Sequence, residues 1–222
     1  MTMGKVTDSL LKGLSGKIGG LVFYQLNGET YVRKAPGKQS KAVKGRTSEL
    51  KQISQDVIRQ THQFLKFFTP LLEFGYQEWG RGGRKPYHAA VSYTIKHSFS
   101  FVGNTAWKKL DLSLLKFSRG SLLGPENPIV ERVSHGVRFS WQDNSNQAGS
   151  KPTDASFLVL VHPDQERSRY CLLGETRSKG VHVLPLSEMD LNESWHAYLA
   201  FSQENPWTRS RVFSDMKYLG VI

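Results

Sequence analysis

Two clusters of basic side chains beside aromatic rings carry the clearest chemical signal in this sequence of 222 residues. The first cluster is a basic strap made of Arg33, Lys34, Lys38, Lys41, Lys44, Arg46 and Lys51. The second is a glycine-rich loop that contains Arg81, Arg84 and Lys85. Lysine and arginine neutralise phosphates, and the rings of Tyr24, Tyr31 and Trp79 are surfaces on which nucleobases stack. Both clusters therefore predict contacts with nucleic acid or another polyanion.

The positive charge is concentrated in the first half of the chain. The net charge is +11 overall. Residues 1–124 hold 20 Lys and Arg against 7 Asp and Glu, which gives +13, and residues 125–222 hold 10 against 12, which gives −2. A positive field on one half attracts anionic partners, and phosphate contacts do not read bases, so we expect little sequence specificity. A basic surface that serves solubility is the alternative interpretation.

The side chains that support catalysis or metal binding form no recognisable motif. None of the seven histidines belongs to an H-E-x-x-H motif, and a single cysteine, Cys171, excludes a disulfide framework and a thiolate zinc site. His182 and His196 could approach each other on neighbouring strands, and Asp143 with Asp154 could hold calcium. Structural roles are commoner for such residues, so we expect a non-enzymatic protein without catalytic residue, metal or cofactor. A catalytic pair assembled from residues distant in sequence stays open.

The sequence lacks the apolar segments that are typical of membrane and exported proteins. Its apolar stretches are far shorter than the roughly 20 residues that span a bilayer, and the first residues do not form a signal peptide. We therefore expect a protein of the cytoplasm, or of a virion or other large assembly, without membrane contact.

A β-hairpin is predicted immediately before the strap. Residues 21–24 and 30–33 are β-branched and aromatic runs, and Asn27-Gly28 between them is a strong turn signal. An isolated hairpin is marginal in water, so this one must pack on the rest of the chain, on a partner protein or on another copy. Because an uncovered edge strand can pair with a neighbour, the alternative function is that of a structural or assembly protein. It would join a homo-oligomer, a large complex or a phage-like particle through the hairpin.

A long amphipathic helix is predicted after the strap, with Thr47 or Ser48 as its N-cap. Apolar residues recur at intervals of three, four or seven along it, namely Leu50, Ile53, Val57, Phe64, Phe68 and Leu71. Pro70 removes one backbone hydrogen bond, so we expect the helix to kink or end just before it. Pro86 suits a first helical turn and predicts a second helix over residues 87–98.

Short strands separated by turns dominate the rest of the chain. The predicted strands span residues 110–119, 130–133, 137–141, 157–161, 170–173, 181–184, 195–201 and 211–219. Glycines and prolines in residues 120–128 indicate a connection between two domains. The sequence thus predicts an α+β protein, with a hairpin and helices in residues 1–124 and an antiparallel β-sandwich in residues 125–222.

The C-terminal strands resemble those of fibronectin type III domains. The resemblance rests on the order of three strands: an early strand with Trp141, a later strand with Tyr198, and a final strand. In those domains a tryptophan and a tyrosine pack in the core between the two sheets. The resemblance therefore implies that Trp141 and Tyr198 take these positions.

A second resemblance covers nearly the whole chain. Residues 15–19, 89–93, 118–122 and 137–145 resemble segments of an uncharacterised protein family of Bacteroidota. That resemblance implies a basic N-terminal part, a C-terminal part similar to a β-sandwich, and no assigned activity. The Arg81-Gly-Gly-Arg loop departs from the family pattern.

Overall fold

Antiparallel sheets and helices occupy separate stretches of the chain, as expected for an α+β protein. The computed structural model describes residues 3–7, 11–26, 28–37, 48–80, 83–164 and 167–222. The chain divides into two compact units, Met1–Gln52 and Ile53–Ile222. The first unit holds an antiparallel sheet, and helices followed by further antiparallel sheets make up the remainder. The predicted α+β fold is therefore confirmed.

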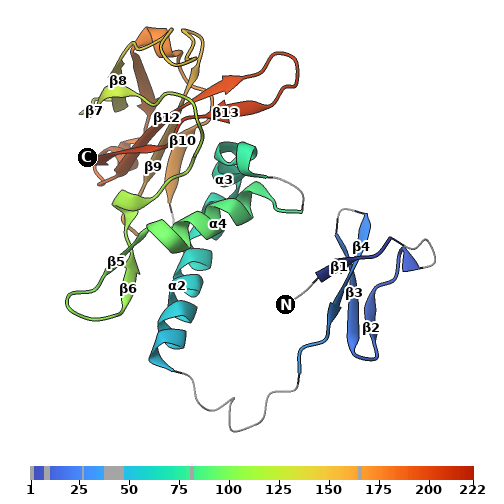
Figure 1. Cartoon of the computed structure of the whole chain (residues 1–222). Coiled ribbons are helices and arrows are strands. Elements are labelled where there is room, and N and C mark those ends of the chain that lie inside the picture. The colour runs from blue at the N-terminus through green and yellow to red at the C-terminus, as the bar shows by residue number, and fades with distance from the viewer. Residues whose placement is uncertain (1–2, 8–10, 27, 38–47, 81–82, 165–166) are drawn as a thin grey trace. The chain divides into compact units, whose positions relative to one another are not determined.

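The predicted hairpin is the centre of a four-stranded sheet. The strands are β1 (Met3–Lys5), β2 (Gly16–Ile18), β3 (Leu21–Leu26) and β4 (Glu29–Lys34). Their spatial order is β1-β4-β3-β2 (Figure 1). β3 and β4 pair along their whole length, which confirms the hairpin. Gly28 has the positive φ, 77°, that its turn requires, whereas Asn27 lies outside the described residues.

Two outer strands that the sequence did not predict cover the edges of the hairpin. β2 pairs with the first three residues of β3, and β1 pairs with residues 31–33 of β4. Each outer strand has three residues, and Gly4 and Gly16 lie within them, so no apolar alternation marked them. Each strand of the hairpin is therefore paired on its outer side over three of its six residues.

In the described part of the chain, three α-helices precede the C-terminal sheets. They are α2 (Glu49–Leu65), α3 (Thr69–Gly75) and α4 (Pro86–His97), with 3₁₀ turns η2 (Lys66–Phe68) and η3 (Gln77–Trp79) between them. The Ser48 hydroxyl accepts a 3.4 Å hydrogen bond from the Lys51 amide at the start of α2. The break expected before Pro70 and the helix expected after Pro86 are both confirmed. None of the helices in the described residues has the length and apolar character needed to cross a membrane.

The C-terminal part contains two larger antiparallel sheets (Figure 1). The five-stranded sheet consists of β9 (Ala155–Val161), β10 (Ser168–Cys171), β12 (His196–Glu204), β13 (Arg211–Phe213) and β14 (Lys217–Val221). The three-stranded sheet consists of β7 (Glu126–Val133), β8 (Gly136–Gln142) and β11 (Val181–Pro185). The remaining elements are the hairpin β5 (Phe99–Phe101) and β6 (Lys108–Leu110), the turns η4 (Leu112–Leu114) and η5 (Arg177–Lys179), and α5 (Glu188–Leu191).

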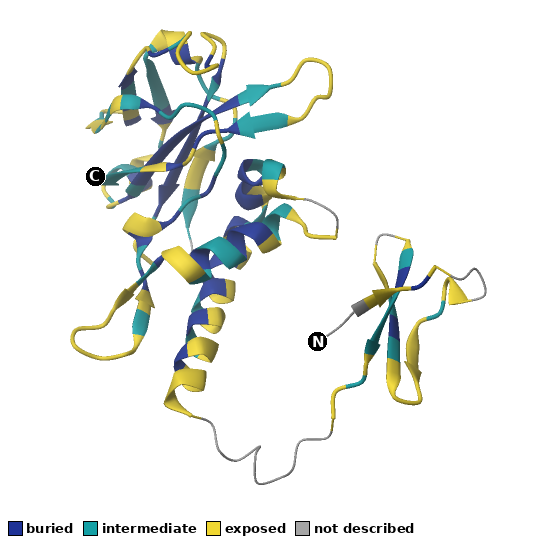
Figure 2. Cartoon of the chain, in the orientation of Figure 1, coloured by how far each residue is buried: buried dark blue, intermediate teal, exposed yellow. Residues whose placement is uncertain are grey.

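The two central strands, β9 and β12, are buried on both faces (Figure 2). On one face, Leu158 and Leu199 belong to an apolar cluster with Phe139 of the three-stranded sheet. On the other face, Phe157 belongs to a second cluster with Phe68 and further residues of the helices. Helices, five-stranded sheet and three-stranded sheet thus form three layers. The domain boundary predicted at residues 124 and 125 stays a prediction, and this shared core runs across it.

Two of the predicted strands differ in the structure: the strand predicted over residues 110–119 is wrong beyond Leu110, and the strand predicted over residues 211–219 is divided. β6 ends at Leu110, because the Asp111 carboxylate accepts a 3.0 Å hydrogen bond from the Ser113 amide and caps a 3₁₀ turn. The stretch from residue 211 to 219 is two strands, β13 and β14. Between them the Ser214 hydroxyl accepts a 2.8 Å hydrogen bond from the Phe201 amide of β12. A side-chain hydrogen bond to the backbone therefore accompanies each of the two breaks, a local one at Asp111 and one between strands at Ser214.

Tyr198 does not share the core between the sheets with Trp141. Trp141 lies in the cluster between the two sheets, as the resemblance implied. Tyr198 lies in the other cluster, and its hydroxyl donates a 2.6 Å hydrogen bond to the Leu112 carbonyl. The implied position of Tyr198 is wrong, because side chains alternate along β12 and residue 198 faces the helices.

Candidate nucleic-acid interface

A stacked pair of tyrosines lies on one face of the N-terminal sheet. Tyr24 of β3 and Tyr31 of β4 are direct cross-strand partners, and their ring centroids lie 5.9 Å apart with 21° between the ring planes. Val22 and Arg33 also pair with each other, and the alternation of side chains places them on the same face as the tyrosines. The structure therefore brings together three residues that the sequence analysis selected, Tyr24, Tyr31 and Arg33.

The outer strands add two lysines to this surface. Lys5 of β1 lies opposite Tyr31, and Lys17 of β2 lies opposite Val22. The surface, named here the tyrosine face, consists of Lys5, Lys17, Val22, Tyr24, Leu26, Glu29, Tyr31 and Arg33. Each of these residues is half-buried or exposed, whereas the centre of the opposite face, at Phe23, is buried. The tyrosine face is thus the open side of the sheet within this unit.

The tyrosine face is positively charged. It carries Lys5, Lys17 and Arg33 against one carboxylate, Glu29. Lys5 and Glu29 form an ion pair of 3.4 Å in which both side chains are about half exposed. Exposed ion pairs of this kind contribute little free energy. Lys5 can therefore exchange its carboxylate partner for a phosphate at small cost.

The other residues of the basic strap are not part of this face. Lys34 follows Arg33 on β4 and lies on the opposite side of the sheet. Lys51 is an exposed residue of the first turn of α2. The remaining basic residues selected from the sequence lie outside the described residues, namely Lys38, Lys41, Lys44, Arg46 and Arg81.

A second basic surface lies on one side of α4, in the other unit. A cavity of about 170 Å³ is lined by Trp79, Arg84, Ala89, Ser92, Tyr93, Lys96, His97 and Arg119. This cavity is named the arginine pocket. Trp79 and Arg84 were selected from the sequence, whereas Lys85, which lies just before α4, is not among the lining residues. The described lining residues include no carboxylate.

The guanidinium group of Arg119 packs over two aromatic rings in this pocket. Its central carbon lies 4.5 Å from the centroid of the Trp79 ring and 4.2 Å from that of Tyr93. The backbone of Arg119 is also held, because its amide donates to the Gly75 carbonyl at 3.2 Å and its carbonyl accepts from the Trp79 indole at 3.0 Å. Cation–π contacts and these backbone bonds together fix the arginine in place.

Helical spacing explains how α4 builds one wall of the pocket. Ala89, Ser92, Tyr93, Lys96 and His97 recur at intervals of three and four residues and share one face of the helix. This spacing is visible in the sequence, but the apolar residues on the other face of α4 give the stronger pattern. Arg119 could not be assigned to the pocket from sequence spacing, because it lies outside α4 and contacts the helix only in the folded protein.

Glu78 and Asp215, two carboxylates beside the neighbours of Arg119, have other partners. Asp215 forms an ion pair with Lys116 and accepts a 3.2 Å hydrogen bond from the Gly120 amide. Glu78 accepts a 2.7 Å hydrogen bond from the Phe213 amide. Burial raises the pKa of the Tyr76 phenol. The positive charge of Arg119 lowers it, but by less. The lining of the pocket therefore stays cationic.

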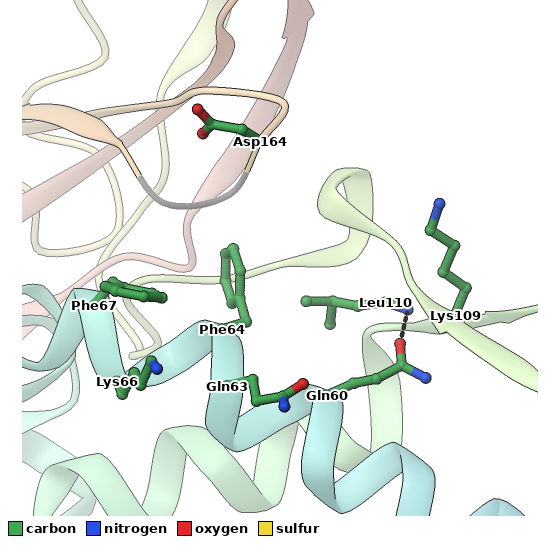
Figure 3. A pocket seen from close by; sticks show the side chains of 8 residues that line it. All are labelled: Gln60, Gln63, Phe64, Lys66, Phe67, Lys109, Leu110 and Asp164. Atoms are coloured by element: carbon green, nitrogen blue, oxygen red, sulfur yellow. Dashed lines mark hydrogen bonds between the residues drawn. The ribbon is translucent and has the colours of Figure 1, made fainter.

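A larger cavity, of about 370 Å³, lies beside α2 and the β5–β6 hairpin (Figure 3). The Gln60 carboxamide accepts a 3.2 Å hydrogen bond from the Leu110 amide and donates one of 3.0 Å to the Lys108 carbonyl. Gln60 thus bonds to the edge of β6 as a neighbouring strand would. Two lysines and Asp164 line the cavity with charges of both signs. Gln60 therefore holds the β5–β6 hairpin against α2, and the mixed charges of the lining do not favour one class of ligand.

The acidic residues considered for calcium binding have structural partners. Asp154 is buried and accepts hydrogen bonds from Arg177 at 3.1 Å and from Gln203 at 2.9 Å. Asp143 accepts a 2.9 Å hydrogen bond from the Ser145 amide, as in an ordinary turn. Within the described residues, no group of three or more His, Cys, Asp and Glu is arranged to hold a metal ion.

The two histidines selected from the sequence lie on different sheets and have separate partners. Nδ1 of His182 on β11 accepts a 2.9 Å hydrogen bond from the Glu175 amide, and Nδ1 of His196 on β12 lies 3.0 Å from the Tyr218 hydroxyl. Burial lowers the pKa of both imidazoles. Burial also raises the pKa of the Cys171 thiol, which disfavours the thiolate needed for nucleophilic attack.

These features define an α+β protein with two basic, aromatic surfaces. The chain belongs to a family of unknown function (DUF6266), whose model matches residues 13–215. No curated protein and no solved structure matches the chain. A functional proposal therefore depends on the geometry described above.

Proposed function

We propose that this protein binds nucleic acid, with little sequence specificity, on the tyrosine face. The observation that carries the proposal is the placement of Tyr24, Tyr31 and Arg33, together with Lys5 and Lys17, on one open face of a four-stranded sheet. Aromatic rings on such a sheet stack unpaired bases, while neighbouring cations contact the phosphates. Because bases in a duplex are already stacked on one another, the preferred ligand is single-stranded.

The charge distribution supports the same function. Residues 1–124 have a net charge of +13, from 20 Lys and Arg against 7 Asp and Glu, and the basic strap begins with the last two residues of β4 and continues beyond it in the sequence. Each phosphate that a cation neutralises releases counterions, so binding weakens as salt rises. Backbone contacts of this kind position the strand without reading its bases, which accounts for the low specificity of the proposed function.

Fluorescence anisotropy with a labelled oligothymidine and the full-length protein tests this proposal. Replacing both Tyr24 and Tyr31 with leucine keeps an apolar pair on the sheet but removes the stacking surfaces. Binding should weaken roughly tenfold or more, since each base–aromatic stack contributes about 1–3 kcal/mol. Tyr170→Leu, at an exposed tyrosine of β10, is the matched control and should change binding less than about twofold.

Heparin separates a nucleic-acid site from a general polyanion site. Heparin has sulfates but no bases, so the double leucine variant should bind it as well as the unchanged protein does. If the variant binds oligothymidine normally, the tyrosine face is not the interface. If it loses heparin and oligothymidine equally, the surface recognises charge alone and the base-stacking part of the proposal fails.

Assembly is the second proposed function, and the outer strand β2 favours it. β2 ends the N-terminal sheet, its outer side has no partner strand in the described part of the chain, and Ile18 on it is exposed. A second copy or another protein can add a strand there. Light scattering after size-exclusion chromatography tests this: an oligomer that Ile18→Lys dissociates supports assembly through β2, and a monomer at all concentrations contradicts self-assembly.

We also infer that the protein has no catalytic centre and acts in the cytoplasm or within a large assembly. The support for the first inference is that the side chains selected as catalytic candidates are held by structural hydrogen bonds. A source within Bacteroidota and a fibronectin type III-like C-terminal part likewise remain proposals that rest on short sequence segments. Hydrolysis or transfer activity that is lost on replacing His182 or His196 would contradict the first inference.

A further inference from the structure

The arginine pocket has the chemical features of a site for a single phosphate group. We propose that it binds a phosphate monoester, with Arg119 as the principal contact and with Arg84, Lys96 and His97 around it. The pocket lies within the unit Ile53–Ile222 and shares no residue with the tyrosine face. The proposal is therefore independent of the nucleic-acid function proposed above.

Arg119 is half-buried, and one donor of its guanidinium group lacks an acceptor. Its Nε is buried and has no hydrogen-bond partner among the described residues. A guanidinium carries five N–H donors in a rigid planar fork, and a buried donor without an acceptor is costly. The rings of Trp79 and Tyr93 attract the positive charge but accept no conventional hydrogen bond. The oxygens of a phosphate group match the fork in a bidentate arrangement and supply the acceptor that Nε lacks.

Arg119 is preorganised for such a ligand. Its backbone is bonded to Gly75 and to the indole of Trp79, and its side chain packs over two rings. A side chain that is fixed in this way loses little conformational entropy on binding. The pocket is thus built around this arginine and is not a chance gap between mobile surface side chains.

The charge and the volume of the pocket favour a small dianion. Arg84, Lys96 and His97 are exposed lining residues, and no carboxylate is among the described residues of the lining. A phosphate monoester carries about two negative charges near neutral pH, because its second pKa is about 6. The cavity of about 170 Å³ is smaller than the roughly 300 Å³ at which pockets for drug-sized ligands begin. It therefore suits the phosphate group, with the rest of the ligand outside.

Three sources present the same phosphate chemistry: inorganic phosphate, a mononucleotide and the 5′-phosphate at the end of a nucleic-acid strand. Isothermal titration calorimetry of the full-length protein with inorganic phosphate and with adenosine monophosphate covers the first two. Two oligothymidines that differ in a 5′-phosphate cover the third. Saturable binding of either small ligand, or tighter binding of the phosphorylated strand, supports the proposal and identifies the source. No saturable binding of the small ligands and no gain from the 5′-phosphate would overturn it.

Substitutions in the lining locate the binding to the pocket. Arg119→Gln should weaken binding roughly tenfold or more, and Arg119→Lys should recover part of it, because the charge returns without the planar fork. Lys96→Gln, at an exposed position of α4, should weaken binding several-fold without threatening the fold. The matched control is Lys109→Gln, an exposed lysine of β6 outside the pocket, which should leave binding unchanged.

Each variant is checked by circular dichroism and by its melting temperature, so loss of folding is separated from loss of binding. If Arg119→Gln does not fold, Lys96→Gln and Lys109→Gln still decide the question. Equal binding by Lys96→Gln and the unchanged protein would then overturn the assignment. The double leucine variant of the tyrosine face should keep its affinity for adenosine monophosphate, which distinguishes failure of one site from failure of the other.

Discussion

Arg177 and Asp154 form an ion pair in the interior, with 3.1 Å between Nε and Oδ2 and with both side chains wholly buried. Arg177 also donates to the Leu123 carbonyl at 2.8 Å and to the Asn144 side chain at 2.6 Å, and it packs over the ring of Phe201. Burial lowers the pKa of Arg177, and the nearby carboxylate opposes that effect. Through its bond to Leu123, Arg177 thereby holds the segment before β7 against the sheets.

Replacing Arg177 with methionine should lower the free energy of unfolding by about 3–5 kcal/mol, because the change leaves the carboxylate of Asp154 buried without its charge partner. The matched control is Arg138→Gln, which removes an exposed ion pair with Glu131 and should cost about 0–1 kcal/mol. Urea denaturation followed by circular dichroism measures both values. Equal effects of the two substitutions would show that the buried pair does not stabilise the fold.

Gly75 at the end of α3 should not tolerate a larger residue. A Cβ atom there would lie 2.0 Å from the carbonyl oxygen of Phe117, so the segment that carries Arg119 would have to move. We expect Gly75→Ala to destabilise the protein by about 1–3 kcal/mol, as overpacking does. Gly124→Ala, at a glycine whose Cβ would meet open space, should have little effect on the melting temperature. A stable Gly75→Ala variant would contradict the close approach.

The stability of the fold should decrease as the solution is acidified below neutral pH. The His182 imidazole is half-buried and accepts a hydrogen bond through Nδ1, and burial lowers its pKa below the usual 6.5. The unfolded chain therefore binds protons at higher pH than the folded chain does. The contribution of His182 to the free energy of unfolding is therefore complete above about pH 6.5. It is lost as the pH falls through the pKa of His182 in the folded protein.

Urea denaturation at several values between pH 7.5 and pH 5 checks this dependence. His182→Gln should reduce the slope of stability against pH. Part of the slope should remain, because burial lowers the pKa of His196 as well and gives it the same sign. A protein that becomes more stable on acidification in this range would contradict the prediction.

The shared core leads to a prediction about fragments. Phe157 and Val159 of β9 lie in one apolar cluster with Phe68 and Leu72 of the helices. A fragment of residues 53–222 should therefore fold, whereas a fragment of residues 125–222 should expose this face of the sheet and fail to fold or aggregate. Circular dichroism and size-exclusion chromatography of the two fragments decide between this expectation and a domain boundary at residues 124 and 125.

Local patterns were sufficient to predict the larger elements. α2 has apolar residues at helical spacing and a serine cap, α4 starts at a proline, and β9 and β12 are continuous apolar runs. The apolar runs predicted strands, but not which layer covers which face of them. That assignment depends on side-chain alternation relative to the helices, which explains why the position implied for Tyr198 was wrong.

The candidate sites were less predictable, because they depend on tertiary neighbours. Tyr24 and Tyr31 were recognisable as hairpin residues, but the lysines beside them come from β1 and β2, which are too short to show a pattern. Arg119 lies 40 residues beyond Trp79 and meets it only because α3 and α4 fold back on each other. Contacts of this kind leave no periodic signal in the sequence.

Neighbouring cations on β4 provide the sharpest test of the tyrosine face. Arg33 lies on the same side of the sheet as Tyr24 and Tyr31, and Lys34 lies on the opposite side. Both substitutions, Arg33→Gln and Lys34→Gln, remove one positive charge from adjacent positions of one strand. A long-range effect of net charge would weaken oligothymidine binding equally in the two variants. A phosphate contact on the tyrosine face predicts a larger loss for Arg33→Gln, with a salt slope that decreases by about 0.7 for the one lost contact. Anisotropy titrations between 50 mM and 200 mM salt measure both quantities, and equal slopes for the two variants would exclude Arg33 as a phosphate contact.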